Sequence, residues 1–304
     1  MSTPRFLKLF AILSLTAASL CLADATAGAT DGITHERDII YGRKYGMALV
    51  LDVLRPANAD GAGIIVVMSG GWKCHDGPVD PDWYSQYLKQ GYTIFAVRHG
   101  SQPRFVLPEI IGDVHRAVRF IRHNAARWPV DPGRLGITGG SAGGHLSLII
   151  GTQGGPGDPD AADPVDRESS AVRAVACFYP PTDFLNYGAE GVSGMGTGPL
   201  AWCYPAFGPR ADMPGSSRQY GREISPIYSV SARTPPVFII HGDRDTTVPL
   251  QQSETFIKRL TGAGVPARLY VKAGAGHTWR DMESKIADGR MVTDWFNQYL
   301  RDQP

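Results

Sequence analysis

Short apolar segments recur along the chain, and most of them are separated by stretches long enough to form a helix. The segments are Ile64–Met68, Thr93–Val97, Leu135–Thr138, Val172–Phe178, Val237–Ile240 and Arg268–Val271. Strands that alternate with helices form a parallel sheet, because each helix carries the chain back across one face of the sheet. The pattern therefore predicts an α/β fold with a mostly parallel, doubly wound sheet.

Three segments have the periodicity of amphipathic helices. In Pro108–Ala126, residues such as Ile110 and Val114 form one apolar stripe, and a proline near the start suits a helix entry. Leu250–Thr261 and Asp281–Leu300 are also predicted to be helical. The periodicity thus places helices between and after the predicted strands.

Two further regions depart from this alternation. Ile39–Tyr45 and Ala48–Leu54 flank a Gly-containing turn and predict an antiparallel pair at the start of the sheet. Pro181–Pro235 is an aromatic-rich insertion that precedes the strand Val237–Ile240. Such an insertion either forms the wall of a substrate pocket or merely packs its aromatic residues onto the domain.

The N-terminus has the pattern of a secretory signal peptide. Arg5 and Lys8 precede the apolar run Leu9–Leu22, and small-residue cleavage sites follow it. We expect residues 1–27 to be removed, residues 28–304 to form one domain, and the protein to be secreted or periplasmic. No later segment approaches the roughly 18 apolar residues of a membrane span.

Three cysteines remain after this cleavage: Cys74, Cys177 and Cys203. An oxidising compartment allows either one disulfide and one thiol, or three thiols. Cys177 lies in an apolar run and is expected in the core. If a disulfide forms, elimination therefore leaves Cys74 and Cys203 as the pair.

Composition excludes several classes of partner. The chain has 304 residues, with 30 Lys plus Arg against 29 Asp plus Glu and a formal charge of +1. A chain with so little net charge and no basic block gives no sign of a nucleic-acid or anionic-membrane partner. A chain of this length can bury a sizeable core, so metals and disulfides are not required for folding.

Gly139-Gly140-Ser141-Ala142-Gly143 matches the nucleophile-elbow motif G-x-S-x-G. It directly follows the strand Leu135–Thr138 and precedes the apolar helix His145–Ile150, which is the setting that lifts a serine above the edge of a sheet. We therefore predict Ser141 as a nucleophile. The alternative is a glycine-rich turn with an incidental serine.

A serine nucleophile needs a histidine base and a carboxylate that orients it. Asp245 and His277 follow Ser141 in the order acid then base, each in a loop after a predicted strand. Asp243 competes for the role of the acid, whereas His241 is expected to make hydrogen bonds within its turn. The strand ends of a parallel sheet lie at one edge, so these loops should meet Ser141 there.

An acyl-transfer site also needs N–H donors for the developing oxyanion. The backbone N–H of Ala142, directly after the nucleophile, is one candidate. Gly70 and Gly71 follow the strand Ile64–Met68 and are the others, although a glycine pair can also form a plain turn.

The elbow Gly-Gly-Ser-Ala-Gly-Gly-His-Leu, the loop ending Gly-Gly-Trp and the segment His-Gly-Asp-Arg-Asp-Thr-Thr-Val-Pro together resemble one group of proteins. This group is the secreted α/β-hydrolases of the feruloyl-esterase-like and hormone-sensitive-lipase-like type. The last segment is also similar to the catalytic domain of prolyl oligopeptidases. The resemblance implies an α/β-hydrolase fold, the catalytic set Ser141, Asp245 and His277, and the oxyanion donors already named.

One position departs from the family pattern His-Gly-Gly-Gly-Trp. Aligned on Trp72, the pattern places Met68 at the histidine and Ser69 at the first glycine. That histidine normally helps to brace the loop, so the geometry of this loop depends on other residues here.

We expect a secreted serine hydrolase that cleaves carboxylic esters through an acyl-enzyme, with no cofactor and no metal. Trp72, Trp202 and Tyr204 offer aromatic faces suited to sugar rings or aryl acyl groups, which favours short-acyl or feruloyl esters of saccharides. A serine exopeptidase and a non-catalytic binding protein on the same fold are the alternatives. The oligomeric state is left open.

Overall fold

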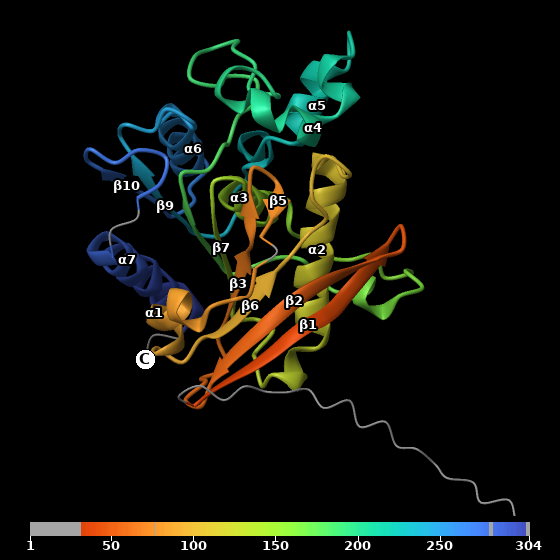
Figure 1. The fold of residues 1–304 in the computed structure, drawn as a ribbon, viewed down its shortest axis with the longest axis vertical. Coiled ribbons are helices and arrows are strands. Elements are labelled where there is room, and N and C mark those ends of the chain that lie inside the picture. The colour runs from red at the N-terminus through yellow and green to blue at the C-terminus, as the bar shows by residue number, and fades with distance from the viewer. Residues whose placement is uncertain (1–31, 76, 280–281, 302–304) are drawn as a thin grey trace, which may run out of the picture.

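The computed structural model describes residues 32–75, 77–279 and 282–301 (Figure 1). The predicted signal peptide, residues 1–27, lies outside the described residues. Within them, one sheet runs through the centre of the molecule and helices lie on both of its sides (Figure 1).

The described chain forms an eight-stranded sheet in the order β1-β2-β6-β3-β7-β8-β9-β10. The strands are β1 (Ile33–Lys44), β2 (Met47–Pro56), β3 (Gly63–Val67), β6 (Thr93–Val97), β7 (Leu135–Gly140), β8 (Ala174–Phe178), β9 (Val237–Gly242) and β10 (Ala267–Lys272). β2 pairs antiparallel with β1 and β6, and the other neighbours are parallel. The predicted α/β-hydrolase sheet and its antiparallel start are confirmed.

β1 is longer than its apolar pattern predicts. It begins at Ile33 rather than Ile39, and its pairing with β2 shifts register between Glu36 and Ile39. Asp38 has a φ of 54° at this irregularity. A bulge breaks the alternation of side chains between the two faces, so the sequence pattern shows only the part of the strand after it.

The four helices predicted from the sequence lie close to their expected positions, and the described chain adds three short helices of four to seven residues. The α-helices are α1 (Ser85–Leu88), α2 (Leu107–His123), α3 (Ala142–Gln153), α4 (Tyr204–Phe207), α5 (Ser217–Glu223), α6 (Gln251–Gly262) and α7 (Met282–Leu300). Short 3₁₀ helices are η1 (Pro81–Tyr84), η2 (Ala125–Arg127), η3 (Pro164–Arg167), η4 (Gly198–Cys203), η5 (Pro209–Asp212) and η6 (Pro226–Ser229). In the described ranges, no helix combines the length and apolar character that crossing a bilayer requires.

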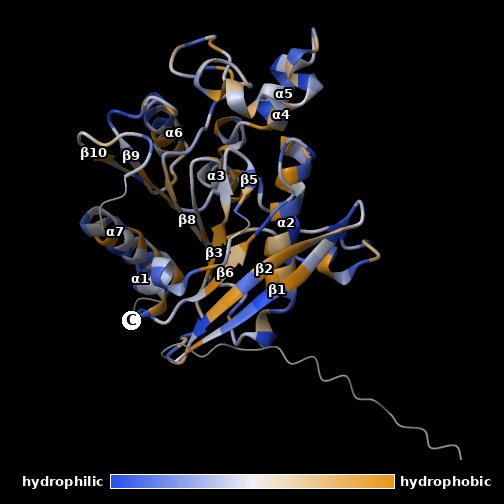
Figure 2. Cartoon of the chain, in the orientation of Figure 1, coloured by the Kyte–Doolittle hydropathy of each residue, from blue (hydrophilic) through white to orange (hydrophobic). Residues whose placement is uncertain are grey.

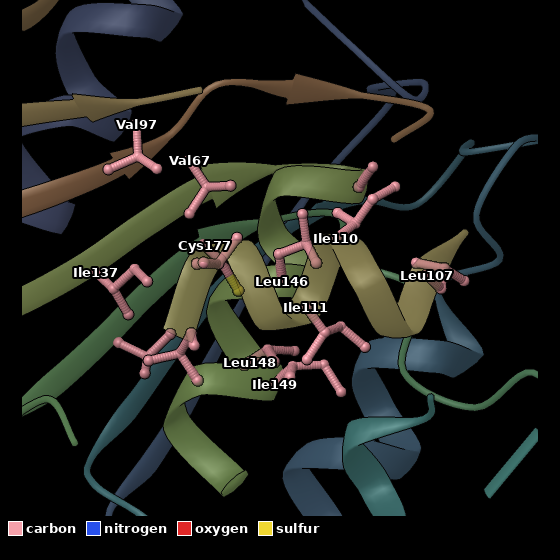
Figure 3. Close-up of a cluster of buried hydrophobic side chains, with 14 of the residues drawn as sticks. Val67, Val97, Leu107, Ile110, Ile111, Ile137, Leu146, Leu148, Ile149 and Cys177 are labelled. Atoms are coloured by element: carbon pink, nitrogen blue, oxygen red, sulfur yellow. The ribbon is translucent and has the colours of Figure 1, made fainter. Parts of the chain in front are cut away.

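The central strands bury side chains on both faces, which explains their continuous apolar runs. In β3, Ile65 and Val67 belong to the core under α2 and α3, whereas Ile64 and Val66 belong to the core that includes residues of α1 and α7. Figure 3 shows Val67 and its neighbours against the side chains of α2 and α3. Each fully buried aliphatic side chain contributes about 1.5–3 kcal/mol, so this double burial holds the inner strands rigidly.

The edge of the sheet differs from its centre. β2 is mostly hydrophobic and buried, whereas β1 beside it is more hydrophilic and more exposed (Figure 2). Polar residues on an edge strand discourage pairing with another chain. β1 therefore forms a polar, solvent-facing edge, and the candidate site is built further in, at the buried strands.

The insertion 181–235 contributes η4, α4, η5, α5 and η6. α4 and α5 lie at the top of the view in Figure 1, whereas η6 packs against α3, where Gln153 at the end of α3 donates to the Ser229 hydroxyl. Most aromatic side chains of the insertion pack inward, including Phe184, Tyr187, Phe207 and Tyr220. Trp202 and Tyr204 are exposed. The packing role thus accounts for most of these aromatics, and only a few remain available to a ligand.

The cysteines are free thiols at all three described positions, Cys74, Cys177 and Cys203. The expected pair of Cys74 with Cys203 is wrong. Cys74 Sγ instead accepts the N–H of His99 at 2.9 Å and lies 3.1 Å from the carbonyl oxygen of His99, while Cys203 is fully buried. Cys177 is a core residue, as its apolar run predicts.

Candidate active site

Ser141 lies on the sharp turn between β7 and α3. Its φ of 53° and ψ of −118° are rare for a residue with a side chain, and its N–H donates to the carbonyl of Phe178 at 2.9 Å. Such a conformation costs about 1–3 kcal/mol and persists only where the surrounding structure fixes it. Here β7 and α3 are both buried and fix the two ends of the turn.

The glycines of the motif allow the backbone segments around this turn to approach each other. A Cβ on Gly139 would lie 2.5 Å from the carbonyl carbon of Gly143, and one on Gly143 would lie 2.6 Å from the carbonyl oxygen of Val67. Both contacts are with backbone atoms, which cannot move aside as a side chain can. The G-x-S-x-G spacing is therefore a steric requirement of this elbow.

Ser141, His277 and Asp245 form one hydrogen-bonded chain. Ser141 Oγ lies 2.9 Å from His277 Nε2, and His277 Nδ1 lies 2.7 Å from Asp245 Oδ2. Because a carboxylate only accepts, Nδ1 carries the proton and Nε2 is left to accept from the serine hydroxyl. The structure thus brings together the three side chains that the sequence singled out.

Asp243 has a different position. It is exposed, and its Oδ1 accepts the N–H of Gly274 at 2.6 Å. This hydrogen bond joins the loop after β9 to the loop that carries His277. Asp243 therefore connects two loops, while Asp245 is the carboxylate that reaches the imidazole.

Asp245 is held as a buried carboxylate. Burial by itself raises the pKa of Asp245, but hydrogen bonds from His241, His277 and the Val248 N–H outweigh burial and bring the pKa well below its usual range. Oδ1 also accepts the N–H of Thr247 at 2.9 Å. The charge that faces His277 is thus present throughout the neutral pH range.

His241 supports this carboxylate from the side. Its Nε2 lies 2.9 Å from the carbonyl oxygen of Val248 and 3.2 Å from Asp245 Oδ2, and its Nδ1 lies 2.7 Å from the Ser253 hydroxyl. Because the carbonyl only accepts, Nε2 is the protonated nitrogen. His241 makes hydrogen bonds within its turn, as the sequence suggested.

The His277 loop is anchored by a residue that the sequence did not single out. Asp288 of α7 is buried, and both its oxygens lie 3.0 Å from Lys272 Nζ at the end of β10. Its Oδ2 also accepts the indole N–H of Trp279 at 2.5 Å. Lys272 and Trp279 stand on either side of His277, so Asp288 fixes both ends of its loop. α7 contains several acidic residues, and nothing in the sequence distinguishes Asp288 from the others as the one that anchors this loop.

The candidate oxyanion loop is a tight hairpin between β4 (Ser69–Gly70) and β5 (Lys73–Cys74). Its two turn residues, Gly71 and Trp72, have φ of 54° and 59°, the left-handed values that a two-residue hairpin favours. Ala142 is the first residue of α3, so its N–H has no acceptor within the helix and lies at the positive end of the helix dipole.

Trp72 is buried, contrary to the expectation from the sequence. The sequence suggested it as an aromatic face for substrate, but the side chain is only 1% exposed. Its indole N–H donates to His145 Nδ1 at 3.2 Å, and its ring packs against Phe184 and Phe207. A residue with a positive φ in a hairpin turn must be held by its surroundings, and burial of the indole performs that task here.

His145 connects this hairpin to α3 and to the insertion. Its Nε2 donates to the carbonyl of Ile224 at 2.7 Å while its Nδ1 accepts from Trp72. Complete burial lowers the pKa of His145 to about 4, so the ring stays neutral and keeps this arrangement at neutral pH. These hydrogen bonds brace the loop where the family pattern has a histidine and this chain has Met68.

Trp202 and Tyr204 differ in their relation to the site. Trp202 is 59% exposed, and a Cβ on Gly71 would lie 2.2 Å from its indole Cη2, so the ring edge lies against the hairpin turn. Tyr204 is exposed and donates its hydroxyl to Asp212 at 2.5 Å. The structure therefore places Trp202 beside the candidate oxyanion loop and shows no such contact for Tyr204 among the described residues.

The close contact at the elbow can be tested with a pair of Gly→Ala variants. Gly143→Ala should destabilise the protein by about 1–3 kcal/mol or more, because its Cβ meets the Val67 carbonyl oxygen at 2.6 Å. Gly112→Ala in α2 is the matched control, since a Cβ there meets nothing within 4 Å and alanine favours a helix by up to about 1 kcal/mol. Urea unfolding measures both, and equal stabilities would contradict the steric argument.

Comparisons with known proteins agree with this geometry. The chain is 32% identical over 232 residues to the probable carboxylic ester hydrolase LipM of Mycobacterium tuberculosis. This alignment covers 74% of this chain and 52% of LipM. It is 30% identical over 268 residues to the esterase LipQ of the same organism, covering 86% of this chain and 61% of LipQ. The chain thus spans only about half to three fifths of the length of these relatives.

A solved structure extends the comparison to nearly the whole chain. A truncated form of a carbohydrate esterase from gut microbiota is 26% identical and superposes with a TM-score of 0.72, covering 90% of this chain and 99% of that one. Like LipM and LipQ, that protein carries the name of an esterase or ester hydrolase. The family model BD-FAE matches residues 51–260, more than two thirds of the chain and including both Ser141 and Asp245. The chain therefore belongs to the BD-FAE family.

Proposed function

We propose that this chain is a serine hydrolase that cleaves carboxylic esters through an acyl-enzyme. The observation that carries the proposal is the hydrogen-bonded chain from Ser141 Oγ through His277 to Asp245, with distances of 2.9 and 2.7 Å. The esterase names of the relatives support the same reaction. The site needs no group beyond these side chains to activate the serine.

In this mechanism Ser141 Oγ attacks the ester carbonyl carbon while His277 Nε2 takes the hydroxyl proton. Asp245 holds the imidazole in the required tautomer and stabilises the imidazolium that forms. The carbonyl oxygen becomes negative and is stabilised by the N–H of Ala142 and by N–H groups of the hairpin at Gly70 and Gly71. His277 then protonates the departing alcohol, and water releases the acid from the acyl-enzyme.

The proposed substrates are short-acyl or feruloyl esters of saccharides. Trp202 presents an exposed indole beside the candidate oxyanion hairpin, where a sugar ring or an aryl acyl group could stack. Similarity to a carbohydrate esterase supports this class. Long acyl chains fit less well, because the described α-helices of the insertion, α4 and α5, have four and seven residues and form no long amphipathic lid.

We also propose that the protein is exported from the cytoplasm. The support is the basic N-terminus followed by an apolar run and small-residue sites within residues 1–27. An esterase of polymeric saccharides would need this location, since its substrate cannot enter the cell.

Replacing members of the proposed catalytic set should separate their roles. Ser141→Ala and His277→Ala should each lower kcat by several orders of magnitude with the fold intact, because the set works as a unit. Asp245→Asn should cost far more than Asp243→Asn, since only Asp245 contacts His277. Initial rates on p-nitrophenyl acetate and circular dichroism of each variant check this. More than a few per cent of wild-type turnover in Ser141→Ala would remove the serine from the mechanism.

The substrate class can be tested with a panel of acetyl, butyryl, octanoyl and feruloyl esters beside acetylated saccharides and aminoacyl anilides. We expect kcat/KM to favour acetyl or feruloyl esters. Trp202→Ala should raise KM several-fold for feruloyl or saccharide esters, with Tyr45→Ala as a control at an exposed aromatic outside the insertion. A maximum at octanoyl would overturn the acyl preference, faster anilide cleavage would favour a peptidase, and no turnover at all would favour a binding protein.

Export is checked on the protein produced from its full gene in a secreting host. Mass spectrometry should find a new N-terminus between about residues 26 and 30, at one of the small-residue sites. Recovery of an uncleaved chain in the cytosol alone would contradict the proposal.

A further inference from the structure

The geometry points to Tyr179 as a substrate-binding residue whose hydroxyl donates a hydrogen bond to the alcohol oxygen of the departing group. This inference rests on the proposed ester hydrolysis and extends it to the leaving-group side of the same site. It implies that the site is built for alcohols that leave poorly, such as the hydroxyls of sugars.

Tyr179 lies directly after β8, between the elbow and the strand that leads to the acid. Its N–H donates to the carbonyl of Ile240 in β9 at 2.9 Å, and the preceding carbonyl of Phe178 accepts the N–H of Ser141 at 2.9 Å. Its φ is 38°, a left-handed value that is rare for a residue with a large side chain. Strain of this kind is typical of positions where a side chain is held in one functional orientation.

The ring of Tyr179 packs against the imidazole of His277. Their centroids are 4.8 Å apart with an angle of 57° between the planes, and the Trp279 ring also contacts Tyr179, with centroids 5.3 Å apart and an angle of 82°. The ring is therefore in contact with the proposed base itself. Since His277 passes the proton to the departing alcohol, a group on this ring is close to the place where that alcohol lies.

Gly140 shows how close the hydroxyl comes to the nucleophile. A Cβ on Gly140 would lie 3.1 Å from Tyr179 Oη and 3.3 Å from Cε2. The motif G-x-S-x-G permits any residue at this position, and Gly140 does not have a left-handed φ that would require glycine. The absent side chain instead leaves room for the Tyr179 hydroxyl next to the residue that precedes Ser141.

The hydroxyl is available to a ligand. Tyr179 Oη makes no hydrogen bond to the described part of the chain, the residue is half-buried, and the oxygen is not among the fully buried unpaired atoms. Burial, together with the charges of Asp245 and Asp288, raises the pKa of Tyr179 to about 12. The phenol thus remains a donor over the pH range in which the imidazole acts as a base.

The strand order assigns this hydroxyl to the leaving group rather than to the oxyanion. The oxyanion hairpin follows β3 on one side of β7, whereas Tyr179, Asp245 and His277 follow β8, β9 and β10 on the other. In the tetrahedral intermediate the negative oxygen points to the hairpin, so the ester oxygen points to His277 and Tyr179. The N–H groups of the oxyanion hairpin and the hydroxyl of Tyr179 therefore lie on opposite sides of Ser141.

The step balances without a further reactant. The bond from Ser141 Oγ to the carbonyl carbon has formed, the bond from that carbon to the ester oxygen breaks, and the proton taken from Ser141 moves from His277 Nε2 to the departing oxygen. Tyr179 donates a hydrogen bond to this oxygen as its negative charge grows and keeps its own proton. An alkoxide needs this help, whereas a nitrophenolate is stable enough to leave without it.

The test compares ethyl acetate with p-nitrophenyl acetate, which form the same acetyl-enzyme and differ only in the alcohol that leaves. Tyr179→Phe keeps the ring and removes the hydroxyl. We expect the ratio of kcat/KM for p-nitrophenyl acetate over ethyl acetate to rise about tenfold or more, the size of one hydrogen bond to a charged group. Tyr270→Phe, on the outer strand β10, is the control and should leave the ratio unchanged.

Each result decides the question. If Tyr179→Phe leaves the ratio unchanged, the inference is wrong. This includes an equal loss of kcat/KM on both esters, which is the result expected if the hydroxyl only helps to maintain the structure of the site. Thermal unfolding of both variants shows whether the fold is affected. Failure of the proposed function is distinguishable, because wild-type enzyme would then hydrolyse neither ester, or Ser141→Ala would retain the activity.

Discussion

The strained backbone of Ser141 is the constraint on which the site depends. A φ of 53° raises the hydroxyl above the sheet edge, and it persists because β7 and α3 are buried on either side of the turn. The contact of Gly143 with the Val67 carbonyl oxygen ties α3 to the end of β3, from which the oxyanion hairpin continues. The same packing therefore sets the position of the nucleophile and that of the hairpin opposite it. A change at the elbow would move both at once.

Buried polar contacts transmit this rigidity to the loops around Ser141. His145 links α3 to the oxyanion hairpin and to the insertion, His241 supports Asp245, and Asp288 anchors the His277 loop through Lys272 and Trp279. In a low-dielectric interior each such group must find its partner or cost free energy. Loops that would otherwise be mobile thus have one favoured arrangement. Pre-organised donors and a pre-oriented base are what acyl transfer requires.

The BD-FAE family model matches most of the strands and helices around the site, but one residue at the hairpin departs from the pattern of related hydrolases. Met68 stands where that pattern has a histidine, and it accepts a hydrogen bond from the Tyr84 hydroxyl at 3.1 Å. The bracing of the hairpin comes instead from the buried Trp72 indole and His145. The loop geometry is therefore maintained by contacts between α3, the hairpin and the insertion rather than within the loop alone.

The sequence by itself determined the features that depend on local order. Alternation of strands and helices predicted the sheet, and the spacing of Ser141, Asp245 and His277 after strand ends predicted that they would meet, because parallel strands end at one edge. The tertiary structure decided which side chains near that edge face the site. Trp72 is buried although an exposed face was expected, and Cys74 and Cys203 are unpaired. Tyr179, directly after β8, and Asp288 of α7 contact the His277 loop. The direction of a side chain depends on the residues packed around it from distant parts of the chain, and no local pattern records them.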